Sequence, residues 1–255
     1  GELAASVNVM LTNLEKSRER QKRLIGDASH ELRTPLTSMR TNVELLLADQ
    51  KTGMLPEQAR GEILTDIAAQ LGEFSSLIGD LVQLSREDAP PPRPEIMDLA
   101  DVVARAVQRA KRRGPTMVFD VQTESQLVLG DSQAIERSVT NLLDNAVKFS
   151  PSGGRITVRM ADETITVADE GPGISDEDLP HIFDRFYRSD QSRNTPGTGL
   201  GLSIVAHTVN SHGGWIKASR APGGGALFTM HLPTVDPDDV AGNESAGSES
   251  LLTSE

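Results

Sequence analysis

The sequence predicts two folded parts: a helical hairpin that forms a dimeric four-helix bundle, and after it an α/β sandwich. Three observations carry this prediction. Apolar residues recur every three or four positions through residues 25–84, as on amphipathic helices. A proline-rich stretch, residues 89–94, then stops helix and favours a stiff extended linker. Beyond it, helical patterns mix with short alternating segments, an order typical of one sheet covered by helices on one face.

The two helices of the hairpin are predicted from their apolar stripes. The stripe of the first helix comprises Ile25, Ala28, Leu32, Leu36, Met39, Val43 and Leu46. The second helix runs from about residue 56 to about residue 86, with the stripe Ile63, Ile67, Leu71, Phe74, Ile78, Leu81 and Leu84. Residues 49–53 break the pattern, so the helices fold back on each other. Because two helices cannot surround a core, we expect pairing with a second copy; packing on the rest of the chain is the alternative.

The sandwich is predicted from alternating and helical segments beyond the linker. The expected helices cover residues 99–113, 132–149 and about 199–212. The expected strands cover residues 117–121, 126–129, 155–160, 164–168, 215–219 and 226–232. A long polar segment precedes Pro196, and residues 234–255 have a composition that cannot form a core, so we expect a disordered acidic tail.

Composition excludes several classes of function. The chain has 255 residues and a formal net charge of −12, which argues against nucleic acid or an anionic membrane as the main partner. It contains no cysteine, so disulfides, thiolate metal sites and cysteine nucleophiles are excluded. No stretch approaches the roughly 20 apolar residues of a membrane span.

The first group of candidate residues is Ser29–Leu36, on the first helix. His30 lies roughly opposite the apolar stripe, and Glu31 can accept its Nδ1 proton and leave Nε2 as a nucleophile. An isolated His–Glu pair is more often a surface pair, but Pro35 inside a strong helical stripe suggests function over stability. A zinc-protease motif needs a second histidine where this chain has Thr34.

Three further groups lie in the sandwich. Asn141, Asn145 and Lys148 share one helix face, which suits a magnesium–triphosphate but is alone weak evidence. Asp169 ends a strand, and the glycines after it allow a flat ring to approach the backbone. The glycines of residues 197–203 open a helix, where backbone amides attract phosphate, although the spacing fits neither a Walker A loop nor a Rossmann fingerprint.

Together and in this order, these groups resemble the H, N, G1 and G2 boxes of bacterial two-component sensor histidine kinases, and Asp184–Arg188 resembles the F box between the last two. The resemblance covers residues 6–233. The sequence around His30 is most similar to that of the actinobacterial MprB-type envelope-stress kinases. Residues 3–11 resemble the last helix of a HAMP linker, which implies the cytoplasmic portion of a cell-membrane sensor whose membrane part lies N-terminal to this sequence.

The resemblance also implies domain boundaries and partners. Residues 1–22 would end a HAMP signalling helix, and residues 23–88 would form the dimerisation and phosphotransfer hairpin. Residues 89–95 would be the linker, residues 96–233 a Bergerat-type ATP-binding sandwich, and residues 234–255 the tail. The implied partners are a second copy of the chain, through the hairpin, and a response regulator.

By the same resemblance, His30 would attack the γ-phosphate of ATP with Glu31 as proton acceptor, and Thr34 would help to remove the phosphoryl group from the regulator. Asn145, with Asn141, would hold Mg²⁺, and Asp169 would bind the adenine amino group. Residues 175–198 would form a mobile lid over ATP. The implied nucleotide-binding residues are Asn141, Asn145, Lys148, Phe149, Asp169, Gly171, Gly173, Ile174, Tyr187, Arg188, Gly197, Thr198, Gly199, Leu200, Gly201 and Leu202.

Two other functions compete with this one. Gyrase-like ATPases share the fold, but they place a glutamate base where this chain has Asn141, which cannot act as a base. A catalytically silent dimeric signalling scaffold would be expected to lose motif residues, and His30, Asn145 and Asp169 are all present.

Overall fold

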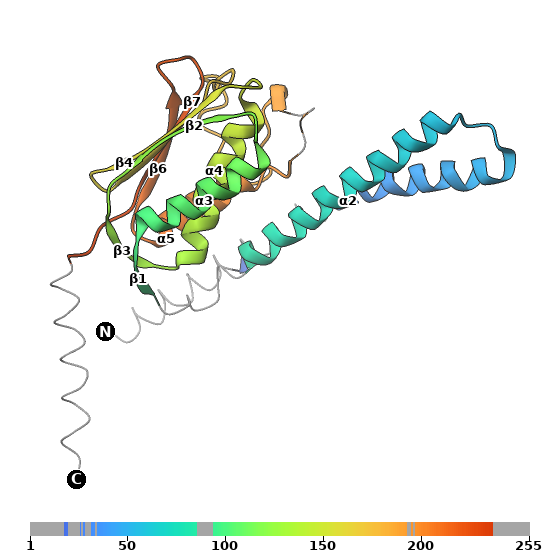
Figure 1. The fold of residues 1–255 in the computed structure, drawn as a ribbon. Coiled ribbons are helices and arrows are strands. Elements are labelled where there is room, and N and C mark those ends of the chain that lie inside the picture. The colour runs from blue at the N-terminus through green and yellow to red at the C-terminus, as the bar shows by residue number, and fades with distance from the viewer. Residues whose placement is uncertain are drawn as a thin grey trace, which may run out of the picture. The chain divides into compact units, whose positions relative to one another are not determined.

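The computed structural model describes residues 18–19, 26, 28, 32–33, 35–85, 94–192, 195 and 197–236. These described residues fall into two compact units: those within residues 1–90 and 190–200, and those within residues 91–189 and 201–255 (Figure 1). The expected HAMP segment up to residue 17, the proline-rich stretch 89–93 and the tail from residue 237 lie outside the described residues. No helix in the described part has the length and apolarity needed to cross a membrane.

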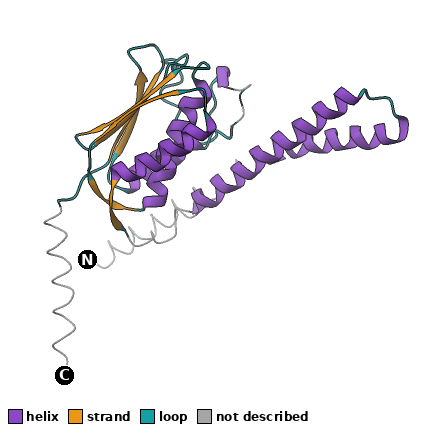
Figure 2. Ribbon diagram, in the orientation of Figure 1, coloured by secondary structure: helices purple, strands orange, loops and turns teal. Residues whose placement is uncertain are grey.

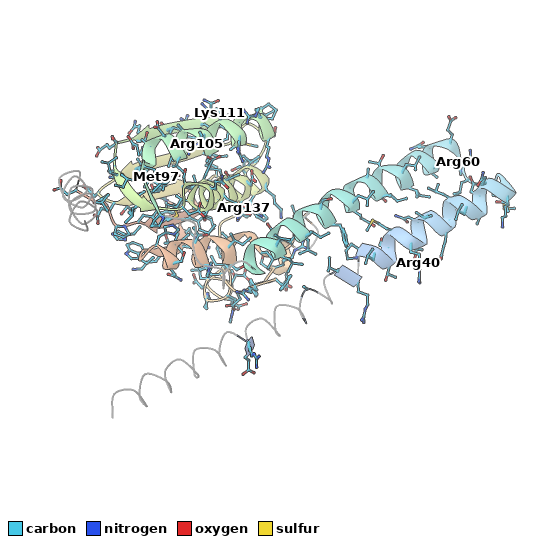
Figure 3. All side chains as sticks on the ribbon, turned by 90° about the horizontal axis from the view of Figure 1, so that it is seen from below. Arg40, Arg60, Met97, Arg105, Lys111 and Arg137 are labelled. Atoms are coloured by element: carbon cyan, nitrogen blue, oxygen red, sulfur yellow. The ribbon has the colours of Figure 1, made fainter. Side chains whose placement is uncertain are left out.

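The first unit contains the predicted hairpin. Residues 35–52 are helical, and α2 covers Glu57–Ser85. The first helix ends at Gly53, whose φ of 62° is left-handed and whose amide donates to the carbonyl of Asp49 at 2.6 Å. Asp49, 4% exposed, also accepts hydrogen bonds from the amide of Leu55 and the guanidinium of Arg60. Arg60 lies near the start of α2 (Figure 3). The helix therefore continues through most of the predicted break and turns only after residue 52.

The apolar residues of the hairpin divide into two sets, where the sequence predicted one stripe per helix. Met39 and Leu77 are buried, and the side chains of Ser38 and Gln70 join the two helices through a hydrogen bond of 2.9 Å. A second set stays exposed to solvent within one chain. This outer seam comprises Leu36, Val43, Leu47, Leu64, Leu71, Ile78 and Val82, which are 43–57% exposed. Four of these residues (Leu36, Val43, Leu71 and Ile78) belong to the predicted stripes, which were expected to pack against a second copy of the hairpin.

The second unit is the α/β sandwich. Its helices are α3 (Leu99–Arg113), α4 (Ser132–Phe149) and α5 (Gly201–Ser211). Its strands are β1 (Glu95–Asp98), β2 (Val118–Thr123), β3 (Leu127–Gly130), β4 (Arg155–Ala161), β5 (Thr164–Ala168), β6 (Trp215–Arg220) and β7 (Ala226–His231). Five strands form one sheet in the order β2-β4-β5-β7-β6, antiparallel except for the β2–β4 pair. The three helices cover one face of this sheet, as predicted (Figure 2).

The sandwich differs from the prediction at its first strand. Glu95–Asp98 is a strand, β1, and it pairs with β3 in a separate two-stranded sheet. The expected linker 89–95 therefore ends before Glu95, and the strand predicted over residues 126–129 does not join the main sheet. Four residues directly after a proline run offer no alternation from which a strand could be predicted.

Alternation along the strands builds the core. On β4, Ile156, Val158 and Met160 are at most 2% exposed, while the residues between them point to the other face of the sheet. Their partners are the apolar stripes of the helices, which include Val103 of α3 and Leu142 of α4, both fully buried. The sandwich is thus closed by its own helices.

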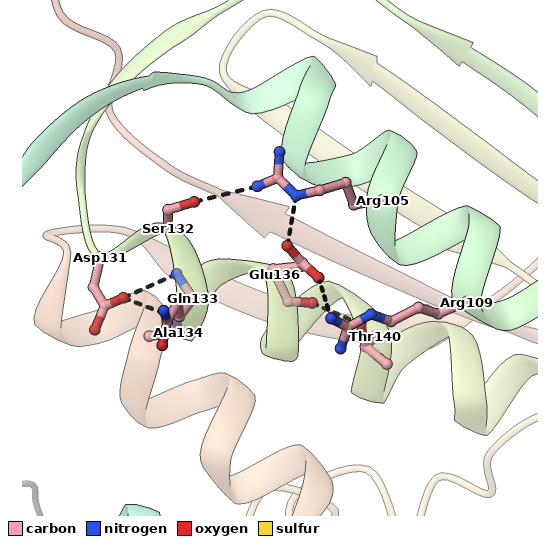
Figure 4. Close-up of polar contacts among 8 residues, drawn as sticks. All are labelled: Arg105, Arg109, Asp131, Ser132, Gln133, Ala134, Glu136 and Thr140. Carbon is pink, nitrogen blue, oxygen red and sulfur yellow. Dashed lines mark hydrogen bonds and ion pairs between the residues drawn. The ribbon is translucent and has the colours of Figure 1, made fainter.

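Polar contacts fix α4 against α3 (Figure 4). Asp131 caps α4 by accepting hydrogen bonds from two backbone amides of its first turn. Glu136 of α4 accepts a hydrogen bond from Arg105 of α3 at 2.6 Å and pairs with Arg109 at 3.1 Å. Arg105 also donates to the hydroxyl of Ser132 at 3.2 Å. These contacts orient the helix that carries Asn141, Asn145 and Lys148.

Candidate functional site

Asp169 is the most completely positioned of the predicted site residues. It follows β5 directly and is 7% exposed. Its Oδ1 accepts hydrogen bonds from the amides of Gly171 at 2.8 Å and Ala226 at 3.0 Å, and its own amide donates to the carbonyl of Ala226 at 3.0 Å. Burial raises the pKa of this carboxyl, and the two amide hydrogen bonds oppose the rise. Because both described bonds use Oδ1, Oδ2 is left to accept a hydrogen bond from a ligand.

The glycines after Asp169 are required by close backbone contacts. A Cβ on Gly171 would lie 2.8 Å from the carbonyl oxygen of Phe149, at the end of α4. Gly173 has a left-handed φ of 77°, and a Cβ there would lie 2.6 Å from the carbonyl oxygen of Gly224. The loop after β5 is therefore held between the end of α4 and the turn before β7. Ile174, the last residue of this motif, packs against the hydrophobic core.

The polar residues of α4 lie on one half-buried face, as predicted. Asn141, Asn145 and Lys148 are each of intermediate exposure. The Nδ2 of Asn141 donates to the carbonyl of Gly201 at 3.2 Å, which ties α4 to the first residue of α5. The ammonium of Lys148 lies 4.8 Å from the ring centre of Phe149. Two amide side chains and an ammonium thus share one face of the helix that ends beside Gly171.

Asp144 lies next to Asn145 but serves a different contact. Its carboxylate pairs with Arg113 at the end of α3, and one of its oxygens, Oδ1, is buried without a hydrogen-bond partner in the described structure. Burial raises the pKa of this carboxyl, and the Arg113 charge opposes the rise. Asp144 therefore helps to hold α4 against α3.

The first half of the predicted lid packs onto the sandwich. Ile182 is 9% exposed and belongs to the core, and Tyr187 packs against the core. The hydroxyl of Tyr187 donates to Asp178 at 2.6 Å, and Ser175 donates to the other oxygen of Asp178 at 2.6 Å. These two hydrogen bonds lower the pKa of Asp178, and the one from Ser175 has the larger effect. The predicted mobile lid over residues 175–198 therefore has an anchored first part, in which the Tyr187 hydroxyl is occupied by the protein. Arg188, another predicted nucleotide-binding residue, is next in the chain after Tyr187.

The glycine-rich motif is divided between the two units. Gly197, Thr198, Gly199 and Leu200 group with the first unit, and Gly201 and Leu202 open α5 in the second. Gly199 has a left-handed φ of 71°, and the hydroxyl of Thr198 accepts from the amide of Leu200 at 3.2 Å. Thr198 also donates to Asp80 of α2 at 3.1 Å. The expected helix start at residue 199 is therefore two residues early.

The predicted phosphotransfer residues His30, Glu31 and Thr34 lie outside the described residues. Neighbouring Leu32, Arg33 and Pro35 are helical, in line with the predicted helix. Among the side chains that the structure describes, no group of three or more histidines or carboxylates could hold a metal ion.

Comparison with known proteins bears on both units. The His kinase A (phospho-acceptor) domain model matches residues 20–90, and the histidine kinase-, DNA gyrase B- and HSP90-like ATPase model matches residues 130–236. A solved structure of the mycobacterial sensor histidine kinase MprB is 38% identical, with a TM-score of 0.52, over 55% of this chain and 98% of that one. The chain belongs to the sensor histidine kinases.

Other members of the family align over more of the chain. The histidine-protein kinase/phosphatase MprB of Mycolicibacterium smegmatis is 48% identical over 96% of this chain and 52% of its own length. MprB of Mycobacterium avium is 46% identical over 97% of this chain and 49% of its own length. The structure of the Acinetobacter baumannii histidine kinase AdeS is 25% identical over 81% of this chain, with a TM-score of 0.60. The chain thus spans about half the length of the curated relatives it matches.

Membership of this family confirms the predicted resemblance and fold class. The match to the ATPase-like domain model supports ATP use by the sandwich. The residues that would serve this function remain the predicted ones.

Sequence reasoning missed one part of the site, the turn Gly223–Gly225 between β6 and β7. A Cβ on Gly225 would overlap the carbonyl oxygen of Asp169, and the next amide in the chain, that of Ala226, holds Asp169 Oδ1. Three glycines between two strands predict a turn. Nothing in the sequence places that turn against an aspartate more than fifty residues earlier.

Proposed function

We propose that this chain is an ATP-dependent protein-histidine kinase that phosphorylates its own His30 from Mg-ATP and passes the phosphoryl group to an aspartate of a response regulator. The observation that carries the proposal is Asp169. It is a buried carboxylate with one oxygen held by two backbone amides and the other left for a ligand. The family of the chain supplies the reaction class.

At the base end of the site, Oδ2 of Asp169 accepts a hydrogen bond from the adenine amino group. The backbone of Gly171 and Gly173 borders the ring, with Phe149 and Ile174 as apolar neighbours. A fixed acceptor in a largely buried position favours a purine with an amino group over one without it, because an unmet buried carboxylate oxygen costs binding free energy.

At the phosphate end, the residue types fit a magnesium–triphosphate. Asn145 and Asn141 offer neutral amide oxygens; since Nδ2 of Asn141 is bound to Gly201, its Oδ1 is the atom left for a metal. Bound there, Mg²⁺ would neutralise charge on the phosphates. Lys148 and Arg188 bring positive charge to the phosphate oxygens. The segment Gly197–Leu202 offers them backbone amides.

The phosphoryl transfer itself occurs on the hairpin. Nε2 of His30 attacks the γ-phosphorus of ATP as the bond to the ADP oxygen breaks, and Glu31 accepts the Nδ1 proton, so the product imidazole is neutral. The phosphoryl group then passes to an aspartate oxygen of the regulator. Thr34, four residues after His30 in the sequence, opposes this transfer by assisting attack of water on the regulator's aspartyl phosphate, which releases inorganic phosphate. Positioning and charge neutralisation supply the rate.

The outer seam of the hairpin supports dimerisation through this element. It presents seven apolar side chains that are 43–57% exposed in one chain. In the same proposal, residues 23–88 form the phosphotransfer hairpin and residues 96–233 the ATP-binding domain, and the chain is the cytoplasmic portion of a longer membrane sensor.

The hydrolase alternative has no support in the site. The position that would need a general base is Asn141, and its side-chain nitrogen donates to the carbonyl of Gly201. An amide with this contact orients a helix and cannot deprotonate water.

The test is incubation of the chain with γ-labelled ATP and Mg²⁺. We expect acid-labile, base-stable label that disappears in His30→Gln and persists in the matched control His207→Gln, because His207 is an exposed histidine of α5. ATP binding without label, or label that survives in His30→Gln, would contradict the proposal. An unchanged rate of regulator dephosphorylation in Thr34→Ala would contradict the role of Thr34.

A further inference from the structure

The turn Gly223–Gly225 between β6 and β7 is closed on itself by two backbone hydrogen bonds. The amide of Ala221 donates to the carbonyl of Gly225 at 2.7 Å, and the amide of Gly224 donates to the carbonyl of Ala221 at 2.9 Å. Ala221 is 6% exposed, so the base of the turn is anchored in the sandwich. The turn therefore has a fixed position relative to the end of β5.

The three glycines of the turn differ in what constrains them. Gly223 has open space around its missing side chain and no left-handed φ. Gly224 also has open space, but its φ of 97° favours glycine. Gly225 is required for space alone: a Cβ there would overlap the carbonyl oxygen of Asp169 and lie 2.6 Å from its Oδ1. Only Gly225 is thus constrained by the presence of Asp169.

The same turn touches the nucleotide loop from a second direction. A Cβ on Gly173 would meet Gly224 O at 2.6 Å, Gly225 O at 3.4 Å and Gly225 C at 3.6 Å. These three nearest atoms all belong to the turn. The turn therefore lies against both Asp169 and Gly173, and it directs the amide of Ala226 at Asp169 Oδ1.

We propose that Gly225 is a positioning residue that sets the base specificity of the site: its missing side chain lets the turn seat against Asp169 and leaves Oδ2 in place to read the amino group of the purine. The inference rests on the proposed ATP binding at Asp169. A methyl group at residue 225 pushes the turn and Asp169 apart, which removes the Ala226 hydrogen bond and shifts Oδ2. Affinity for the aminopurine then falls, while a purine without the amino group loses little.

The test compares the affinities of the whole chain for ATP and for purine riboside triphosphate, which has hydrogen in place of the amino group. We expect wild type to prefer ATP by about tenfold or more, since a hydrogen bond to a charged group is lost with the analogue. In Gly225→Ala this ratio should fall towards one. Gly223→Ala, in the same turn but with open space, should keep it.

The ratio separates positioning from general destabilisation, because a loosened fold weakens both nucleotides together. Gly173→Ala is the second variant, since a Cβ there would press on the carbonyl oxygen of Gly224 in the same turn. It should lower the ratio even if Gly225→Ala does not fold. A wild-type ratio near one, a folded variant at Gly225 or Gly173 that keeps the wild-type ratio, or loss of the ratio in Gly223→Ala would each overturn the inference. A wild type that binds no ATP would overturn the proposed function as well.

Discussion

The two units of this chain differ in how they bury their apolar residues. The sandwich buries its apolar residues within one chain: Leu142, Val158 and Met230 are all at most 2% exposed. The hairpin keeps a full outer seam in solvent, with Leu64 57% and Leu71 52% exposed. The sandwich buries its apolar residues without a partner, whereas the hairpin presents an apolar surface that a second copy can cover. Ligand binding should therefore belong to a single chain, and phosphoryl transfer to an assembly.

The buried carboxylates of the units differ in the same sense. In the hairpin, Asp49 is fully paired at the turn, and the hydrogen bond from the Leu55 amide, followed by the one from Arg60, lowers its pKa. In the sandwich, Asp169 keeps one oxygen for a ligand, and burial raises its pKa. The charged form of Asp49 is thus stabilised by the fold. The charged form of Asp169 is destabilised by burial until a ligand donates a hydrogen bond to its free oxygen.

The largest expected effect is on dimerisation, in a variant that places charges in the outer seam. In Leu64→Glu/Leu71→Glu we expect a monomer, because each leucine buried on association contributes about 1.5–3 kcal/mol. Four leucines are lost per dimer, so association should weaken by at least about a thousandfold. Sedimentation equilibrium would measure it.

Met54→Glu is the matched control for the seam variant. Met54 is 83% exposed but lies in the turn of the hairpin, away from the seam. The control should therefore remain a dimer. A dimer that persists unchanged in the seam variant would place the interface elsewhere.

The second effect concerns the base end of the sandwich. In Asp169→Asn the amide oxygen can still accept from Gly171 and Ala226, and only the atom that faces the ligand changes from acceptor to donor. We expect ATP affinity to fall by about tenfold to a hundredfold without a fall in thermal stability. Isothermal titration and thermal unfolding would measure the two quantities.

The pH dependence of that variant follows from the raised pKa of Asp169. A raised folded-state pKa means that folding favours the neutral carboxyl at low pH, and that this advantage is lost as pH rises through the raised value. Wild type should therefore lose stability relative to Asp169→Asn as pH increases through that range. A gap that widens instead on acidification would contradict the assigned burial.

The third effect has the opposite sign and lies in the hairpin. The pKa of Asp49 is lowered, so its contribution is complete above the ordinary value of 3.8 and is lost as pH falls through the lowered one. Acid should thus weaken the hairpin turn in wild type, and Asp49→Asn should flatten that dependence. Amide exchange of Leu55 between pH 7 and pH 3 would show it; equal slopes in both proteins would contradict it.

The smallest effect compares surface charges in the two units. Glu136 is 13% exposed at its side chain and pairs with both Arg105 and Arg109, so Glu136→Ala should lower the free energy of unfolding by about 1 kcal/mol. Glu44 is 65% exposed and, within the described residues, pairs with the exposed Arg40 at 3.5 Å, so Glu44→Ala should cost a few tenths of a kcal/mol at most. Denaturant titration would rank them, and an inverted order would contradict the comparison.

The sequence predicted best where local signals and burial agree. The bounds of α3, α4 and β5 are those expected, because caps such as Asp98 and Asp131 sit directly before apolar periodic runs. The sequence failed where long-range contacts decide. No local pattern encodes three of the observed contacts: the pairing of β1 with β3, the approach of Gly225 to Asp169, and the hydrogen bond from Tyr187 to Asp178.

The outer seam shows a third limit. Periodicity correctly identified Leu36, Val43, Leu71 and Ile78 as apolar positions of helices. It also indicated that the hairpin needs a second copy, but it could not separate the residues that join the two helices of one chain from those left for that copy, because both recur with the same spacing.

In the proposed function, ATP binding needs one sandwich, whereas phosphorylation of His30 needs the paired hairpin. The most direct test measures ATP affinity and γ-phosphate labelling side by side in wild type and in Leu64→Glu/Leu71→Glu. We predict unchanged ATP affinity and at least a tenfold loss of label per chain in the monomeric variant. Full labelling by a demonstrated monomer, or a parallel loss of ATP binding, would contradict this division of roles between the sandwich and the hairpin.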